Sequence, residues 1–250
     1  MIDLTHQGSV AVLRMIHGKA NALDLEFCDA LTKQLEECRQ TADGAIVLTG
    51  TGRMFSAGVD LLRVVDGGAA YVRRFLPALG RMLETLFSLQ KPVVAAINGH
   101  AIAGGCVMAC AADYRMMARE PGRIGIPELL VGVPFPVVPI EIVRFAVPPQ
   151  HLQSLVYRGV TLEADAALQY GLVDAVVDPG RLLDEAIGMA RSFAALPPAA
   201  FAMTKDQLRE PARRRIAAGR TGDAAAEDTW ASRETLALIR DYVSRTLSKA

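Results

Sequence analysis

The sequence predicts an α/β fold in which short buried strands alternate with helices. Two continuous apolar runs of five residues, 45–49 and 93–97, suit strands that are buried on both faces. Around them lie stretches whose apolar residues recur at spacings of three and four, which is typical of amphipathic helices. Strands separated by helices are the pattern of βαβ units.

The elements follow in order along the chain. The run from Val10 to Ile16 is rich in β-branched residues and predicts a strand. Asp24 is a suitable cap for the helix that follows, and we expect Gly44 to close that helix. Its apolar stripe consists of Cys28, Leu31, Leu35 and Cys38. Further on we expect a helix over 71–89, a strand over 93–97, a turn over 98–100, a buried helix over 104–112 and a strand over 114–118.

The composition changes near residue 195. Pro197-Pro198 opens a helical segment, 209–220 is basic, and 224–247 has the pattern of one helix. Its apolar side carries Trp230, Leu236, Ile239 and Val243. We therefore expect an α/β core over residues 1–195 and a C-terminal helical segment over 196–250, of the kind that packs on a neighbouring subunit in an oligomer.

The bulk properties exclude several classes of function. The formal net charge is zero, whereas a protein whose main task is binding nucleic acid needs a net basic surface. The four cysteines form no CxxC pair, so we expect no metal site. No apolar stretch reaches the length of a membrane span. Residues 1–8 show no leader pattern and Ser248-Lys249-Ala250 lacks the final Leu of a peroxisomal signal, so we expect a cytoplasmic protein.

The first candidate for chemistry is the stretch 97–106, where a buried strand leads through a turn into a helix whose first turn is glycine. Free N–H groups at such a helix start attract negative charge, and glycine lets a substrate approach the backbone. Gly99 and Gly104 have the spacing of a phosphate loop, but Gly105 and Cys106 stand where Lys and Ser or Thr are needed. The alternative is a glycine pair that only allows close packing of helix and sheet.

A second small-residue corner, 52–61, also follows a buried strand. Both corners would direct N–H groups into one crevice at the strand ends. Ser56 and His100 suggest a Ser–His hydrolase, but there is no GxSxG motif and no well-placed third acid.

Glu128 is the third candidate because it stands inside the apolar run 125–132. Burial penalises the charged carboxylate and raises its pKa, which suits a general base. The alternative is a glutamate that faces solvent or pairs with Arg115 or Arg144.

These segments, in this order, resemble the crotonase family, also called the enoyl-CoA hydratase/isomerase family. The resemblance covers roughly the first 180 residues. The matching motifs are Lys19-Ala20-Asn21-Ala22-Leu23, Phe55-Ser56-Ala57-Gly58-Val59-Asp60-Leu61, 91–99, 103–106, 113–115, 127–132 and 171–177.

The resemblance implies a crotonase-like ββα spiral core and an acyl-CoA thioester substrate. By position, the backbone amides of Ala57 and Gly104 would hold the thioester oxygen, and Glu128 would act as the catalytic base. The other substrate-binding residues implied are Lys19, Ala20, Leu23, Gly58, Val59, Asp60 and Leu61. We expect Pro134, Phe135 and Pro136 to shape the acyl pocket, with Phe135 binding substrate, and the alternative is a rigid turn. No cofactor is implied beyond the CoA of the substrate, and no nucleic acid or membrane partner is expected. We expect the chain to form a homotrimer or a homohexamer.

One position departs from the hydratases of this family. Hydratases carry two glutamates that activate a water molecule. In this chain, Val107 stands where the first of these glutamates would be. The isomerase branch has a single Glu at the position of Glu128, so the resemblance favours Δ3,Δ2-enoyl-CoA isomerisation. A hydratase, another crotonase-type reaction such as decarboxylation, a thioester hydrolase and a non-catalytic RNA-binding member remain as alternatives.

Overall fold

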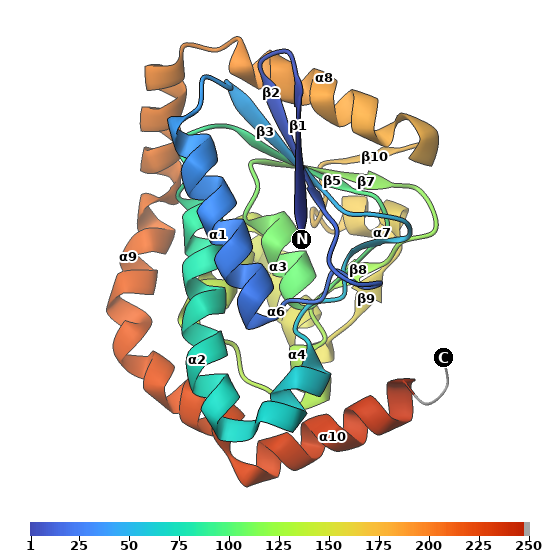
Figure 1. The fold of residues 1–250 in the computed structure, drawn as a ribbon, viewed down its shortest axis with the longest axis vertical. Coiled ribbons are helices and arrows are strands. Elements are labelled where there is room, and N and C mark those ends of the chain that lie inside the picture. The colour runs from blue at the N-terminus through green and yellow to red at the C-terminus, as the bar shows by residue number, and fades with distance from the viewer. Residues whose placement is uncertain (248–250) are drawn as a thin grey trace.

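The computed structural model describes residues 1–247 and consists of two β-sheets surrounded by helices (Figure 1). The prediction for the last three residues, 248–250, lies outside the described residues. The first sheet has six strands in the order β1-β2-β3-β5-β7-β10. They are β1 (Ile2–Gln7), β2 (Val10–Met15), β3 (Ala45–Thr49), β5 (Val93–Ile97), β7 (Tyr114–Ala118) and β10 (Ala175–Val177). All neighbours run parallel except β1 and β2, so the α/β prediction is confirmed.

Alternate residues of this sheet face two different cores. Helix α8 (Leu182–Ala194) covers one face and packs there on Val47, Val94 and their neighbours. The opposite face packs on α1 (Leu25–Gln40), α2 (Leu61–Phe87) and α3 (Gly104–Cys110). Because β3 and β5 are buried at every position, both read as continuous apolar runs in the sequence.

The second sheet is small and has the order β4-β6-β8-β9. Its strands are β4 (Met54–Ser56), β6 (His100–Ile102), β8 (Ile124–Gly125) and β9 (Thr161–Leu162), and only β9 runs antiparallel to its neighbour. The expected turn over 98–100 is therefore shorter than predicted, since His100 already begins β6. Strands of two or three residues are too short to show a periodic pattern.

Helix α1 begins as predicted but ends earlier. The Asp24 side chain accepts a hydrogen bond from the Phe27 N–H at 2.8 Å and caps the first turn. The helix ends at Gln40, so the prediction that Gly44 closes it is wrong. Gly44 is needed for a different reason, because a Cβ there would lie 2.8 Å from the Cβ of Ala194 in α8.

Helix α2 is longer than the predicted 71–89 segment. It begins at Leu61, capped by the Asp60 carboxylate, which accepts a hydrogen bond from the Arg63 N–H at 3.1 Å. Gly68 interrupts it with φ 56° and ψ −152°, a conformation that favours glycine. The first turns therefore point in a different direction from the long part of the helix, and the kink hid them from a search for a single period.

Two helices close the described chain. Helix α9 (Pro198–Ala231) begins at the predicted Pro197-Pro198 and runs along α2 and α5 (Val137–Ala146). Ser232 then separates it from α10 (Arg233–Leu247), so the single helix expected over 224–247 is two. Of the predicted apolar side, Trp230 and Ile239 are buried. A division at residue 195 and a role in oligomerisation stay predictions.

Four short elements remain. They are α4 (Glu128–Val131), α6 (Pro149–Arg158), α7 (Ala164–Gln169) and a 3₁₀ turn at Pro179–Arg181. Within residues 1–247, no helix has the length and apolar character needed to cross a membrane.

Candidate active site

The two glycine corners predicted from the sequence meet in the structure. Gly58 has φ 81°, and a Cβ on it would lie 2.6 Å from the Ile102 carbonyl oxygen and 3.0 Å from the Gly104 nitrogen. A Cβ on Gly104 would lie 2.8 Å from Cδ1 of Leu23. Gly58 therefore needs to be glycine so that the segments 57–60 and 102–104 can touch, whereas Gly104 leaves room for the Leu23 side chain.

The segment 57–60 is fixed by backbone hydrogen bonds to 20–23. The Ala57 N–H donates to the Ala20 carbonyl at 3.0 Å, and the Leu23 N–H donates to the Gly58 carbonyl at 2.8 Å. The Asp60 N–H in turn donates to the Leu23 carbonyl at 3.0 Å. The Asn-Ala-Leu motif thus acts as a template for the backbone around Val59.

This pattern revises one expected donor. Because the Ala57 N–H is already bonded to Ala20, it does not face a substrate, contrary to the expectation for Ala57. The Val59 N–H makes no hydrogen bond within the described residues, and neither does the Gly104 N–H at the start of α3. Val59 and Gly104 line the same cavity as Glu128, whereas Ala57 does not. Sequence spacing alone could not show this, because the amides of Ala57 and Val59 are only two residues apart after the same strand.

The direction of the Gly104 amide is set by a strained residue. Ala103 has φ 52° and ψ −124°, an unfavourable conformation for a residue with a Cβ. It is held there because its N–H donates to Gly125 at 2.8 Å and its carbonyl accepts from Val107 at 3.0 Å. Such strain costs about 1–3 kcal/mol and is concentrated at functional sites.

Glu128 is the first residue of α4 and is buried. Its Oε2 has no hydrogen-bond partner among the described residues. Burial raises the pKa of this carboxyl group to about 8, and the neighbouring Cys110 adds to the rise while the backbone amide of Glu128 opposes it. The pairing alternatives are not formed, because Arg115 binds Asp174 at 2.8 Å and Arg144 binds Glu141 at 3.0 Å.

The cavity in front of Glu128 is otherwise apolar. It is lined by Val59, Leu79, Leu83, Gly104, Val107, Glu128, Pro134, Phe135, Pro136, Pro139 and Trp230. Glu128 is the one ionisable side chain in this lining, and the buried Val107 faces the same space. Phe135 lines the cavity as the sequence suggested. Trp230 was expected only as part of an apolar helix face; its Nε1–H donates to the Pro134 carbonyl at 2.8 Å.

The structure does not join Ser56 to His100. The buried Ser56 hydroxyl donates to the Asn21 carbonyl at 2.8 Å and accepts from the Gly58 N–H at 3.2 Å. Burial lowers the pKa of His100, and the nearby guanidinium groups of Arg53 and Arg123 lower it further. With its proton committed to Asn21, Ser56 has no base beside it, so the geometry does not support a Ser–His hydrolase.

The other expected substrate-binding residues surround this centre. Lys19 is exposed and Ala20 is half-buried at the end of the 20–23 template. Asp60 caps α2, which begins at Leu61. Their contacts to a CoA group stay predictions. In the described part of the chain, no group of three or more His, Cys, Asp or Glu side chains is placed to hold a metal ion.

The chain is similar to known proteins over most of its length. The family described as "Enoyl-CoA hydratase/isomerase" matches residues 5–237. A putative enoyl-CoA hydratase from Thermus thermophilus is 35% identical over 194 residues, which are 76% of each chain. A carnitinyl-CoA dehydratase from Salmonella arizonae is 33% identical over 83% of this chain and 80% of its own.

Two solved structures show the same fold. The human mitochondrial Δ3,Δ2-enoyl-CoA isomerase superposes with a TM-score of 0.94 at 25% identity, over 99% of this chain and 98% of its own. An enoyl-CoA isomerase from Mycobacterium tuberculosis superposes with a TM-score of 0.83 at 32% identity, over 90% and 97%. The chain therefore belongs to the enoyl-CoA hydratase/isomerase, or crotonase, family of acyl-CoA enzymes.

Proposed function

We propose that this chain is a Δ3,Δ2-enoyl-CoA isomerase with Glu128 as its single acid–base group. The observation that carries the proposal is the cavity lining, in which the Glu128 carboxyl group, whose Oε2 has no hydrogen-bond partner among the described residues, is accompanied by Val107 and otherwise apolar side chains. Shifting a double bond needs one group that removes a proton and returns it. Adding water needs further polar groups to hold and activate the water molecule, and the Val107 side chain supplies none.

The Glu128 side chain alone carries out both proton transfers of the reaction. The Glu128 carboxylate removes a proton from C2 of a 3-enoyl-CoA, and the electron pair of that C–H bond forms the dienolate. The carboxylic acid then delivers the same proton to C4, which leaves the double bond between C2 and C3 and restores the thioester carbonyl. The raised pKa of Glu128 makes the carboxylate a stronger base than an exposed glutamate.

The negative charge of the dienolate needs donors at the thioester oxygen. We assign this role to the backbone amides of Val59 and Gly104, with Val59 in place of Ala57, because these two N–H groups are free and line the cavity of Glu128. One fixed donor of this kind contributes about 2.7–4 kcal/mol to transition-state stabilisation. Being fixed by the packing of Gly58 against Gly104, the amides need no reorganisation during the reaction.

The rest of the proposal concerns binding and assembly. We infer that CoA enters as part of the substrate, that no further cofactor takes part, and that Lys19 and Ala20 lie beside its nucleotide portion. We also propose a cytoplasmic homotrimer or homohexamer. The similarity to the human mitochondrial isomerase supports the isomerase activity.

Replacing Glu128 tests the proposal directly. Glu128→Gln keeps the shape of the side chain but removes the base, so isomerisation of a 3-enoyl-CoA should fall by about 10²–10⁴-fold. The reaction is followed by the absorbance of the conjugated product. Glu36→Gln, an exposed change on α1, should retain wild-type activity. Near wild-type activity in a folded Glu128→Gln protein would sink the proposal.

Hydration is the second candidate because two relatives are named as a putative hydratase and a dehydratase. It predicts that a 2-enoyl-CoA loses its conjugated absorbance when mixed with the enzyme. For an isomerase with Val107 opposite Glu128, this loss should be far slower than isomerisation. A hydration rate equal to or above the isomerisation rate would favour the second candidate.

A further inference from the structure

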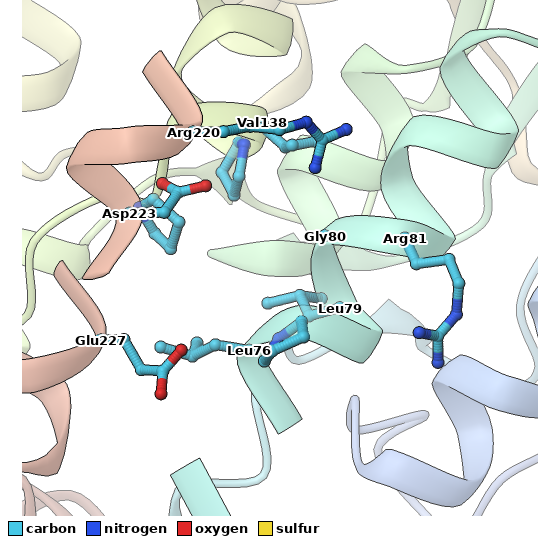
Figure 2. A pocket seen from close by; sticks show the side chains of 11 residues that line it. Leu76, Leu79, Gly80, Arg81, Val138, Arg220, Asp223 and Glu227 are labelled. Atoms are coloured by element: carbon cyan, nitrogen blue, oxygen red, sulfur yellow. The ribbon is translucent and has the colours of Figure 1, made fainter. Parts of the chain in front are cut away.

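A larger cavity adjoins the cavity of Glu128. It lies between α2 and α9, and Figure 2 shows its lining at close range. Leu79, Pro136 and Pro139 line both cavities. The two cavities are therefore adjacent, with these three residues between them.

The two sides of this outer cavity differ in chemistry. The side formed by α2 and the start of α5 is largely apolar and includes Leu76, Leu79 and Val138. The α9 side presents charged residues at spacings of three and four, which places them on one helix face: Arg220, Asp223 and Glu227. An occupant that fits both sides has an apolar body and a charged or polar end.

Most charged groups of the lining are already neutralised by ion pairs. Arg81 binds Asp29 at 2.9 Å, Arg220 binds Glu84, and Glu227 binds Arg73 at 3.2 Å. Arg81 and Arg220 therefore add little net charge to the cavity, whereas Glu227 shares its arginine with Asp228.

Asp223 is the exception. Its Oδ1 accepts the Val137 N–H at 2.7 Å, but no Lys, Arg or His of the described residues forms an ion pair with it. The carboxylate thus leaves a negative charge without a cationic partner.

Asp223 lies next to the place where the two cavities meet. Val137 directly follows Pro136, which is one of the residues shared by the two cavities. The carboxylate that binds the Val137 N–H therefore lies beside the junction between them. An acyl chain that extends from the Glu128 cavity past Pro136 passes this carboxylate.

We propose that Asp223 is a specificity-determining residue and that the outer cavity takes the distal part of an acyl group carrying a positive charge. This inference rests on the proposed function, because the acyl group is that of the CoA substrate. Leu76, Leu79 and Val138 contact its apolar portion, and Asp223 supplies the opposite charge at its end.

Binding of saturated acyl-CoA thioesters tests this without any turnover. Three thioesters of equal chain length are compared by titration calorimetry at low salt, ending in trimethylammonium, in tert-butyl, and in carboxylate. The wild type should bind the trimethylammonium form about fivefold more tightly than the uncharged form, as expected for a half-exposed ion pair. The carboxylate form should bind most weakly.

Asp223→Asn should abolish the preference while leaving the affinity for the tert-butyl form unchanged. Asn keeps an oxygen that accepts the Val137 N–H, so only the charge is lost. Glu210→Gln is the matched control, because it removes a charge from the same helix at a position outside the cavity lining, where its partner is Arg214. Equal binding of all three thioesters by the wild type, or a preference that survives in Asp223→Asn, would overturn the inference.

A separate assay distinguishes this inference from the proposed function. If an unsubstituted 3-enoyl-CoA is isomerised but the charge preference is missing, only the role of Asp223 fails. If the preference is present but no 3-enoyl-CoA is isomerised, only the isomerase proposal fails.

Discussion

At the scale of single residues, the site depends on a buried carboxyl group that forms no ion pair with the Lys, Arg and His side chains of the described residues. Burying an unpaired charge is costly, and a structural carboxylate in such a place is normally paired. Glu128 is not, because Arg115 and Arg144 are each bound to another acid. Its Oε2 has no hydrogen-bond partner among the described residues, which leaves it free to exchange a proton with a ligand.

The raised pKa of Glu128 predicts the pH dependence of the reaction. Only the carboxylate is a base, and the group loses its proton with a pKa of about 8. The kcat/KM for isomerisation, which reports the free enzyme, should rise about tenfold per pH unit below that value and level off above it. Initial rates from pH 6 to 9.5 check this. A profile that is flat down to pH 6 would contradict it.

The residue scale also shows where sequence reasoning stops. The importance of Gly104 and Glu128 follows from their residue types and surroundings, and the structure brings both to one cavity. The choice between Ala57 and Val59 depends on which N–H the Ala20 carbonyl accepts, which is a property of pairing between distant segments. The strain at Ala103 is equally invisible, because alanine shows no preference for a positive φ.

At the scale of elements, α9 reaches the active site although it begins far from it. Its last turn carries Trp230, which lines the Glu128 cavity and donates its indole N–H to Pro134. Asp223, two turns earlier, accepts the Val137 N–H. The two hydrogen bonds flank Pro134 to Pro136, so α9 fixes the wall of the cavity opposite the α3 glycines.

Trp230 is the single tryptophan of the chain, so its fluorescence reports on this wall. An acyl group that fills the cavity contacts the buried indole ring and changes its surroundings, so the emission maximum should shift. Titration with a saturated acyl-CoA should give a saturable shift, whereas free CoA should give little. The signal should disappear in Trp230→Phe. An unchanged spectrum at saturating acyl-CoA would argue against an acyl group beside Trp230.

Several element boundaries follow from the sequence and others do not. The cap at Asp24 and the start of α9 at Pro198 are local signals and were predictable. Gly44, the kink at Gly68 and the break at Ser232 depend on packing between distant segments. Strand β1 and the small sheet were missed because β1 is largely exposed and the strands of the sheet have two or three residues each.

At the scale of the whole molecule, one buried ion cluster joins α9 to the sheet. Asp113, between α3 and β7, binds Lys205 at 2.6 Å and Arg209 at 2.7 Å, and it accepts the Val93 N–H at 2.8 Å. Lys205 also donates to the Lys91 carbonyl at 2.9 Å, and the Arg209 guanidinium lies 4.3 Å from the ring centre of Phe87. The cluster thus ties the C-terminal helices to the strands and helices that position the site.

Removing the anion of this cluster should destabilise the fold. The side chains of Lys205 and Arg209 are 5% and 4% exposed, so Asp113→Asn leaves two buried cations without their shared carboxylate. We expect a loss of about 3–5 kcal/mol in the free energy of unfolding, measured by urea titration. Asp165→Asn breaks an ion pair with Arg119 in which both partners are at least half exposed, and it should cost at most about 1 kcal/mol. Equal losses in the two variants would show that the cluster does not hold α9 on the core. A selective loss in Asp113→Asn, with lower activity at temperatures where its unfolding begins, is the result that the joined architecture predicts.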